Sequence, residues 1–272
     1  MSTVCMIRKP NKKDPSSPRS YRPITLEECL GKLLEKIIAT RLQDSALRHN
    51  LLPLNQFGGR IKSGVIDACI DLCDEIQTAT SQKLYVSVLC CDVKGFFDNV
   101  TLHPLQTCLS NMGLAPHLVQ WITSFASNRK VRIAFNGYTH SSLDKPNRGV
   151  PQGSPISPIL AELFAASALQ LFPPSHPVRL RAYVDDHTLS TASTSLEENE
   201  ARLTQAYHTL ETHLASLGLA LEADKTELMH FYAKHPFQRP INFNPERTSN
   251  YAFTLPLLDG SVMKVSPVPV LR

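Results

Sequence analysis

Apolar residues follow one another almost without a break over residues 84–91, and most of them are of types favoured in strands. Such a run predicts a β-strand that is buried on both faces and that ends at Asp92. Shorter β-forming runs at 179–183, 187–191 and 226–231 predict three more strands. We expect the four strands to form one small antiparallel sheet.

Apolar residues spaced three and four apart predict helices elsewhere in the chain. Thr25 followed by Glu28 has the pattern of a capping box, which predicts a helix continuing to about Asn50. One side of this helix carries the apolar residues Leu26, Leu30, Leu33, Ile37 and Leu42. A second helix follows a glycine-rich basic loop at 56–64. Its inward side is expected to hold Val65, Ala68, Cys69, Leu72 and Ile76.

Four further helices are predicted, at 101–112, 116–127, 155–171 and 195–217. Ser195 followed by Glu198 predicts the N-cap of the last one. Asn136-Gly137 between two β-forming runs predicts a hairpin with a type I′ turn. Weaker hairpin-like runs lie at 251–257 and 261–265. The pattern as a whole predicts an α+β fold, with a small antiparallel sheet backed by helices.

Charge is unevenly distributed along the chain. The net charge of all 272 residues is +4, but residues 1–62 hold 12 Lys or Arg against 5 acidic residues. This segment therefore has a net charge of +7, and the rest of the chain is slightly acidic. A basic lobe beside an acidic one fits a polyanionic partner, with carboxylates gathered elsewhere for metal, although an ordinary solvated surface explains the charge equally well.

The seven cysteines have no regular spacing, so they resemble buried free thiols of a reducing compartment rather than a disulfide framework. No apolar run approaches the roughly 18 residues that a membrane-spanning helix needs, so no membrane partner is expected. The N-terminal residues have no signal-peptide apolar region. The sequence therefore predicts an intracellular protein of the nucleus or cytoplasm that is not secreted.

Two adjacent carboxylates, Asp185 and Asp186, fall between two predicted strands. Their repulsion costs stability unless a cation is present, but Asp is also a common turn residue, so an isolated pair has a purely structural interpretation. A third carboxylate, Asp92, follows another apolar strand, and folding can bring it to the pair. Three carboxylates so placed can hold two Mg²⁺ ions about 4 Å apart, with Mn²⁺ as an alternative, for in-line nucleotidyl transfer.

A loop rich in glycine and proline, residues 148–158, separates these carboxylates in the sequence. Ser154 and Pro155 suit the N-cap and first position of the next helix. That structural interpretation does not account for Gly149 and Gly153, which let the backbone approach another group closely, or for Gln152 held out between them.

Three stretches resemble motifs A, B and C of reverse transcriptases and occur in that order: Asp92 with Phe97-Asp98, Gly149 to Pro158, and Tyr183-Val184-Asp185-Asp186. Gly218-Leu219 followed by Lys225-Thr226-Glu227 resembles motif D. Residues 20–26, 34–37 and 55–58 resemble the fingers region of non-LTR (LINE-type) retrotransposon polymerases. The resemblance covers essentially residues 7–272.

The resemblance implies a role for each matching residue. Asp92 and Asp185 would bridge the metal ions, with Asp186 assisting and the Val93 carbonyl completing one shell. Lys225 would lie near the pyrophosphate as a general acid. The residues expected to contact the nucleotide or the template are Gln152, Gly153, Arg22, Arg60 and Lys62.

Phe97 separates two classes of polymerase that share this layout. An aromatic ring at this position would stack beneath the sugar and exclude a 2′-hydroxyl, which favours dNTPs. Viral RNA-dependent RNA polymerases are similar but have an Asp there. The structural alternative is a core aromatic residue beside Phe96.

Some positions depart from the family pattern. Val184 stands where Ala is more usual, which should leave metal binding unchanged. Residues 59–64 differ from the family's Phe-Arg-x-x-Arg-Ser-Thr, which weakens the assignment of Arg60 and Lys62. The thumb is expected to be missing, with residues 257–272 resembling the lead-in to it, so processive copying by this chain alone is not expected.

The resemblance implies the fingers and palm of a right-hand polymerase. The expected divisions are fingers at 1–83, palm at 84–128, a fingers hairpin insertion at 129–148, palm at 149–235, and a truncated palm-to-thumb lead-in at 236–272. The expected activity is RNA-directed DNA polymerisation with an RNA template, a DNA primer and dNTPs as partners. The alternative is a degenerate or domesticated retroelement fragment that binds nucleic acid without polymerising.

Overall fold

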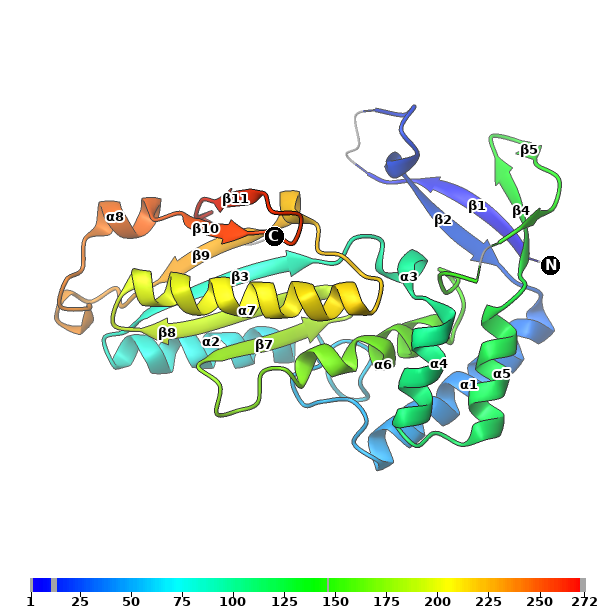
Figure 1. The fold of residues 1–272 in the computed structure, drawn as a ribbon, viewed down its shortest axis with the longest axis horizontal. Helices are drawn as coiled ribbons and strands as arrows, with labels where there is room; N and C mark the ends of the chain where they lie inside the picture. The colour runs from blue at the N-terminus through cyan, green and yellow to red at the C-terminus, as the bar shows by residue number, and fades with distance from the viewer. Residues whose placement is uncertain (1, 11–13, 146, 270–272) are drawn as a thin grey trace. The chain divides into compact units, whose positions relative to one another are not determined.

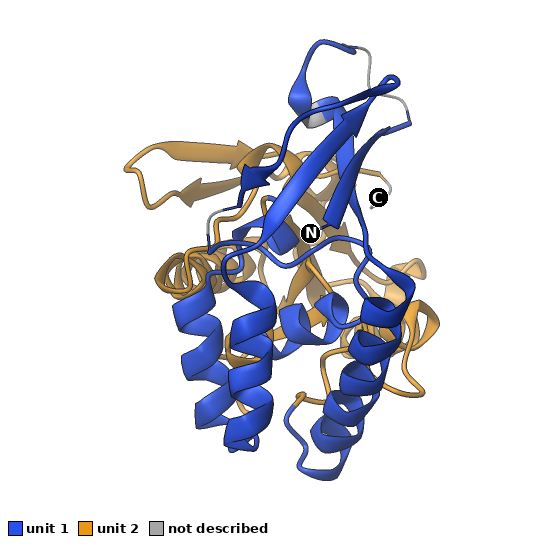
Figure 2. Cartoon of the chain, turned by 90° about the vertical axis from the view of Figure 1, so that its right-hand side faces the viewer, with its two compact units in different colours: residues 1–51, 95–164 blue, residues 52–94, 165–272 orange. Residues whose placement is uncertain are grey.

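The structure is a computed structural model that describes residues 2–10, 14–145 and 147–269. The chain divides into two compact units, each built from two separate stretches of sequence. Unit 1 comprises residues 1–51 and 95–164, and unit 2 comprises residues 52–94 and 165–272 (Figure 2). Both units combine helices with a small sheet, so the α+β prediction is confirmed.

A four-stranded sheet forms the centre of unit 2, in the order β7-β8-β3-β9 (Figure 1). Its strands are β7 (Val178–Tyr183), β8 (Asp186–Ser193), β3 (Tyr85–Asp92) and β9 (Glu227–Phe231). Every neighbouring pair is antiparallel. These pairings confirm the predicted antiparallel sheet. The near-continuous apolar run of β3 suits its central position, where a strand is covered on both faces.

Helices α2 (Val65–Ser81) and α7 (Leu196–Ser216) cover opposite faces of this sheet (Figure 1). Val86 and Val88 pack with Ala79 of α2 in one apolar cluster. Ser87, which lies between them and therefore points to the other face, accepts a hydrogen bond from Asn199 of α7 at 2.9 Å. The two-residue alternation of the strand thus decides which side chains meet which helix.

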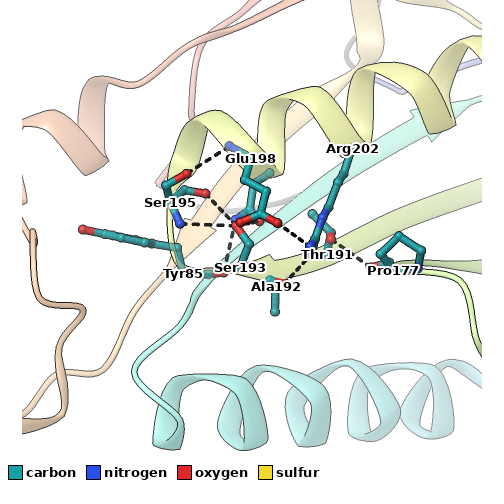
Figure 3. Close-up of polar contacts among 9 residues, drawn as sticks. Tyr85, Pro177, Thr191, Ala192, Ser193, Ser195, Glu198 and Arg202 are labelled. Carbon is teal, nitrogen blue, oxygen red and sulfur yellow. Dashed lines mark hydrogen bonds and ion pairs between the residues drawn. The ribbon is translucent and has the colours of Figure 1, made fainter.

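The N-terminus of α7 is tied to the ends of the strands by polar contacts (Figure 3). Ser195 is the N-cap, and its side chain accepts from the Glu198 backbone N–H at 3.1 Å, as predicted. The Ser193 hydroxyl donates to the Ser195 carbonyl at 2.7 Å, and Arg202 donates to the Ala192 carbonyl at 2.9 Å. These contacts fix the helix on β8 from its first turn.

The last part of unit 2 forms a hairpin of β10 (Phe253–Pro256) and β11 (Val262–Val265), which confirms the weak hairpin prediction. The short helix α8 (Pro245–Asn250), whose N-cap is Asn244, was not predicted from the sequence pattern. Two 3-10 turns complete this stretch, η2 (Ala223–Lys225) and η3 (Pro236–Gln238).

Unit 1 contains the second sheet, in the order β2-β1-β4-β5 with β6 also on β4. Its strands are β1 (Ser2–Arg8), β2 (Tyr21–Leu26), β4 (Lys130–Phe135), β5 (Tyr138–Thr139) and β6 (Leu143–Asp144). Asn136 and Gly137 both have positive φ, 49° and 81°, as the predicted type I′ turn requires. The turn prediction is confirmed.

The helices of unit 1 are α1 (Cys29–Arg48), α3 (Phe96–Asn99), α4 (Leu102–Asn111), α5 (Pro116–Ala126) and the first part of α6 (Ser157–Leu169), with the 3-10 turn η1 (Pro18–Ser20). The predictions for 101–112 and 116–127 are confirmed. Helix α6 begins at Ser157 rather than Pro155. Helix α3 and strands β1, β2 and β6 were not predicted from the sequence pattern.

The predicted start of α1 is wrong. Thr25 belongs to β2, and its N–H donates to the Gln152 carbonyl at 2.7 Å, so it stays extended and Glu28 becomes the N-cap. The predicted apolar side of the helix is buried only in part, because Leu42 is buried but Leu33 and Ile37 are exposed. Leu30 is 81% exposed, whereas the buried residues are Glu35, Ile38, Ala39, Leu42 and Ala46.

The inward side predicted for α2 is partly wrong. Leu72 and Ile76 pack against the sheet, but Val65 and Cys69 are exposed. All seven cysteines are free, which confirms the absence of a disulfide framework, although Cys29, Cys69 and Cys73 are exposed rather than buried. No helix in the described part of the chain combines the length and apolar character needed to cross a bilayer.

Candidate active site

Asp92 and Asp186 occupy directly opposed positions where β3 ends and β8 begins. Because opposed residues of an antiparallel pair point to the same face, the two carboxylates share one face of the sheet. Asp92 and Asp186 line a cavity of about 350 Å³. Asp224 and Lys225 of η2 and Glu227 of β9 line it too. Folding thus brings together acids that are far apart in the sequence.

The electrostatics of this cavity are those of crowded negative charge. Partial desolvation raises the pKa of the Asp186 carboxyl, and repulsion from Asp185 and Asp92 raises it further. The Lys225 ammonium donates a hydrogen bond to Asp92 Oδ2, and this bond raises the pKa of Lys225. Lys225 thus supplies positive charge beside Asp92, Asp185 and Asp186.

The donor set suits a hard divalent cation, because it consists of carboxylate oxygens whose repulsion a cation would relieve. Within the described ranges, no group of three or more His, Cys, Asp or Glu is arranged to hold a metal ion. Lys225 already engages one oxygen of Asp92. The carboxylate oxygens are therefore suitable ligands for a metal ion. In this structure, the ammonium of Lys225 forms an ion pair with one of these carboxylates, that of Asp92.

The turn between β7 and β8 consists of Val184 and Asp185. Val184 has a φ of 60°, a conformation that is costly for a β-branched side chain. Positive φ at the first turn position alone is typical of a type II′ turn, in which glycine is usual. The backbone at the aspartate pair is therefore strained, and its surroundings must hold it.

Residues 55–58, which we call the supporting segment, provide that support. The Ala182 N–H donates to the Asn55 carbonyl at 3.0 Å, and the Phe57 N–H donates to the Ala182 carbonyl at 2.9 Å. A Cβ on Gly58 would lie 2.7 Å from both Cγ2 and N of Val184, so only glycine allows this approach. These residues were matched to a family motif in the sequence, but their position against the turn was not predicted.

His187 lies in β8 next to the pair and is buried. Its Nδ1 is 3.1 Å from the Asp185 carbonyl oxygen, which fits an Nδ1–H donor and a neutral ring. Burial lowers its pKa, consistent with that neutral form. Its Nε2 is buried and has no hydrogen-bond partner among the residues that the structure describes. We therefore interpret His187 as a residue that stabilises the turn through its hydrogen bond to the Asp185 carbonyl.

Val93, whose carbonyl was expected to contact metal, is buried after β3 and forms an isolated bridge with Leu221. The hydrogen bonds of this bridge run from the Lys94 N–H to Ala220 O and from the Glu222 N–H to Asp92 O. They anchor the backbone at Asp92 to the segment that leads into Lys225.

The remaining predicted nucleotide contacts are divided between the units. In unit 1, Phe97 is half-buried beside Phe96, and Gln152 Nε2 donates to Asp98 Oδ2 at 3.3 Å. Gly153 has a φ of 107°, and a Cβ there would lie 2.8 Å from the Thr25 carbonyl oxygen. These contacts hold the loop at 149–154 against β2 and α3.

The three basic residues predicted to contact the triphosphate or template belong to both units. Arg22 is exposed on β2 of unit 1. Arg60 and Lys62 are in unit 2, where Arg60 donates to the Leu54 carbonyl at 3.2 Å and Lys62 is exposed with a φ of 61°.

Comparison with protein families gives one match over nearly the whole chain. A family model described as reverse transcriptase (RNA-dependent DNA polymerase) matches residues 7–254. The chain is 32% identical over 264 residues to a probable RNA-directed DNA polymerase from transposon BS of Drosophila melanogaster, covering 95% of this chain and 26% of that protein. It is 29% identical to the RNA-directed DNA polymerase from mobile element jockey of Drosophila funebris, over 82% of this chain and 25% of the relative.

Among solved structures, the chain is similar to telomerase from Candida tropicalis in complex with a fragment of telomeric RNA, with a TM-score of 0.58 and 12% identity. The match covers 86% of this chain and 41% of the telomerase chain. A truncated apo telomerase from the same organism gives a TM-score of 0.52, over 79% and 48% of the two chains. At such low identity the likeness concerns the fold alone. The chain spans about a quarter of the length of the two mobile-element polymerases.

Proposed function

The chain belongs to the reverse transcriptase (RNA-dependent DNA polymerase) family, and from this premise we propose that Asp92, Asp185 and Asp186 are the catalytic carboxylates of its polymerase centre. The observation that carries the proposal is the register of β3 and β8, which sets Asp92 directly opposite Asp186. The reaction would be template-directed addition of dNMP to a primer 3′-end, with an RNA template, a DNA primer and dNTPs as partners.

The family in general uses divalent metal ions, and we propose that two Mg²⁺ ions, or Mn²⁺ in their place, bind here. Asp92 and Asp185 would hold them, assisted by Asp186 and the Val93 carbonyl. Bound ions would supply activation of the primer hydroxyl and neutralisation of the triphosphate. The chain's own carboxylates would fix where those charges lie, since the bonds at 220–222 anchor Asp92 and the supporting segment holds the turn.

We propose that Lys225 serves as the proton donor to pyrophosphate. The pKa of its ammonium is raised because the ammonium donates a hydrogen bond to Asp92, so the side chain remains protonated. It would give up a proton only when the charge of Asp92 is neutralised. The side chain is partly exposed at the cavity, which leaves it free to reorient toward a bound triphosphate.

In the right-hand description of polymerases, we propose fingers at 1–83 and 129–148 and palm at 84–128 and 149–235, so that the four-stranded sheet of unit 2 would belong to the palm. Phe97 would exclude the ribose 2′-hydroxyl, and Gln152 with Gly153 would contact the incoming nucleotide. Arg22, Arg60 and Lys62 would contact triphosphate or template backbone. The basic N-terminal charge supports a polyanionic partner.

Primer extension on an RNA template with Mg²⁺ tests the proposed function. The matched control is the double variant Asp185→Asn/Asp186→Asn, which removes charge at nearly constant volume. We expect extension by the wild type well above this control. Equal signals, with RNA binding retained, would favour the alternative of a nucleic-acid-binding fragment without polymerase activity.

A further inference from the structure

Two segments of unit 1 that are distant in sequence are joined by backbone hydrogen bonds. The Val150 N–H donates to the Phe97 carbonyl at 2.8 Å, and the Gly149 N–H donates to the Val100 carbonyl at 2.6 Å. Thr101 and Arg148 form an antiparallel bridge next to them. The backbone at Phe97 is therefore held by the glycine loop and not only by its own short helix.

Gly149 packs against the backbone of Asp98 so closely that no side chain fits between them. A Cβ at this position would lie 2.9 Å from the Asp98 carbonyl oxygen and 3.1 Å from Asp98 Cα. Both atoms are backbone, so the neighbour cannot rotate away as a side chain could. Gly149 also has a φ of 81°, in the left-handed region. The contact needs glycine for two separate reasons.

The side chain of Gln152 completes the connection by donating to Asp98 Oδ2 at 3.3 Å. Asp98 follows Phe97 directly in the sequence. Gln152, which is expected to contact the incoming nucleotide, therefore binds the segment that carries Phe97, which is expected to contact the sugar of that nucleotide. A shift of 97–98 would move both of them.

We propose that Gly149 is a specificity-determining residue that sets the position of Phe97 and thereby the discrimination between deoxyribose and ribose. The inference deepens the proposed function and rests on Phe97 being the residue beneath the sugar. Gly149 itself touches no substrate in this scheme and acts through the Phe97–Asp98 backbone.

The test compares kcat/KM for one dNTP and its matching rNTP in the wild type and in Gly149→Ala. The added Cβ should displace the Phe97–Asp98 backbone, so we expect the dNTP preference to fall about tenfold, in the direction of Phe97→Ala. Gly137→Ala is the matched control, because Gly137 has the same φ of 81° but a Cβ there would meet nothing within 4 Å. It should leave the preference unchanged.

Equal losses for dNTP and rNTP in Gly149→Ala would overturn the inference, as would an unchanged preference in a folded variant. Should Gly149→Ala fail to fold, Val150→Pro reaches the same segment by removing the N–H that donates to Phe97, and the same fall is expected.

Amide hydrogen exchange separates a failure of this inference from a failure of the proposed function. If the wild type extends primers no better than the Asp185→Asn/Asp186→Asn variant, the polymerase proposal fails. Exchange over residues 96–101 then decides whether Gly149 holds Phe97. We expect faster exchange there in Gly149→Ala than in Gly137→Ala, and equal rates would refute the connection.

Discussion

The Lys225 ammonium donates to Asp92 Oδ2 across 133 residues of sequence, at the cavity that Asp186 also lines. A cation that binds Asp92 through this oxygen must displace the lysine or share the carboxylate with it. The ion pair therefore weakens the binding of a metal ion to Asp92, and it also holds Lys225 at this cavity.

Replacing Lys225 by Ala should strengthen binding of Mn²⁺ severalfold, because the metal no longer competes with an ammonium for Asp92. The same change should lower primer extension, since the proposed proton donor is lost. Isothermal titration calorimetry with Mn²⁺ measures the first effect. Lys234→Ala, at another exposed lysine of unit 2, is the control. Weaker Mn²⁺ binding in Lys225→Ala would contradict the competition.

The Gly58→Ala variant should lose primer extension by about a hundredfold, because a Cβ 2.7 Å from Val184 forces the aspartate turn to move. Stability should fall by roughly 1–3 kcal/mol, the usual cost of overpacking. Gly64→Ala in the same unit is the control, because its Cβ would meet only Asp67 Oδ2, at 3.9 Å. Primer extension and thermal denaturation are measured together, and full activity in Gly58→Ala would show that the supporting segment is not needed.

These two sites illustrate what the sequence allows one to predict. The strands of unit 2 were predictable because their apolar runs are local, and so was the cap at Ser195, which involves residues three apart. The approach of Gly58 to Val184 was not, because nothing local distinguishes a glycine that touches a distant turn from one in a flexible loop.

Unit 1 shows the same limit more clearly. Thr25 with Glu28 matches a capping box, but the Thr25 N–H donates to Gln152, and this distant partner keeps it in a strand. The sequence pattern also indicated which side of α1 is apolar, whereas packing buries the side that carries Glu35, whose carboxylate accepts from the Ser154 hydroxyl. Tertiary contacts overrode local signals at both positions.

Arg181 should be among the most sensitive residues of unit 2 for stability. Its side chain is 5% exposed and forms ion pairs with Asp71 at 2.5 Å and Glu75 at 2.7 Å, linking β7 to α2. Arg181→Met would leave the mostly buried Glu75 carboxylate without its cation, so we expect a loss of about 3–5 kcal/mol in urea denaturation. Adding Glu75→Gln should restore part of it. Additive losses in the double variant would show that the pair is not coupled.

Glu162, on α6, predicts a pH dependence of folding. It is fully buried, and neither carboxylate oxygen has a hydrogen-bond partner within the described part of the chain. Burial raises its pKa from 4.5 to about 8. Between these values the folded protein keeps a proton that the unfolded chain has released, so stability must fall as pH rises, by about 1.4 kcal/mol per pH unit at most.

The Glu162→Gln variant has no such proton and should lack this slope. We therefore expect it to be as stable as the wild type near pH 5 and more stable near pH 8, by on the order of 3 kcal/mol. Urea denaturation at several pH values between these limits measures the difference. Glu246→Gln, at an exposed acid in the first turn of α8, is the control and should leave the slope unchanged. If the stability of wild type and Glu162→Gln changed with pH in parallel, Glu162 would be ionised in the folded protein, with a compensating partner nearby.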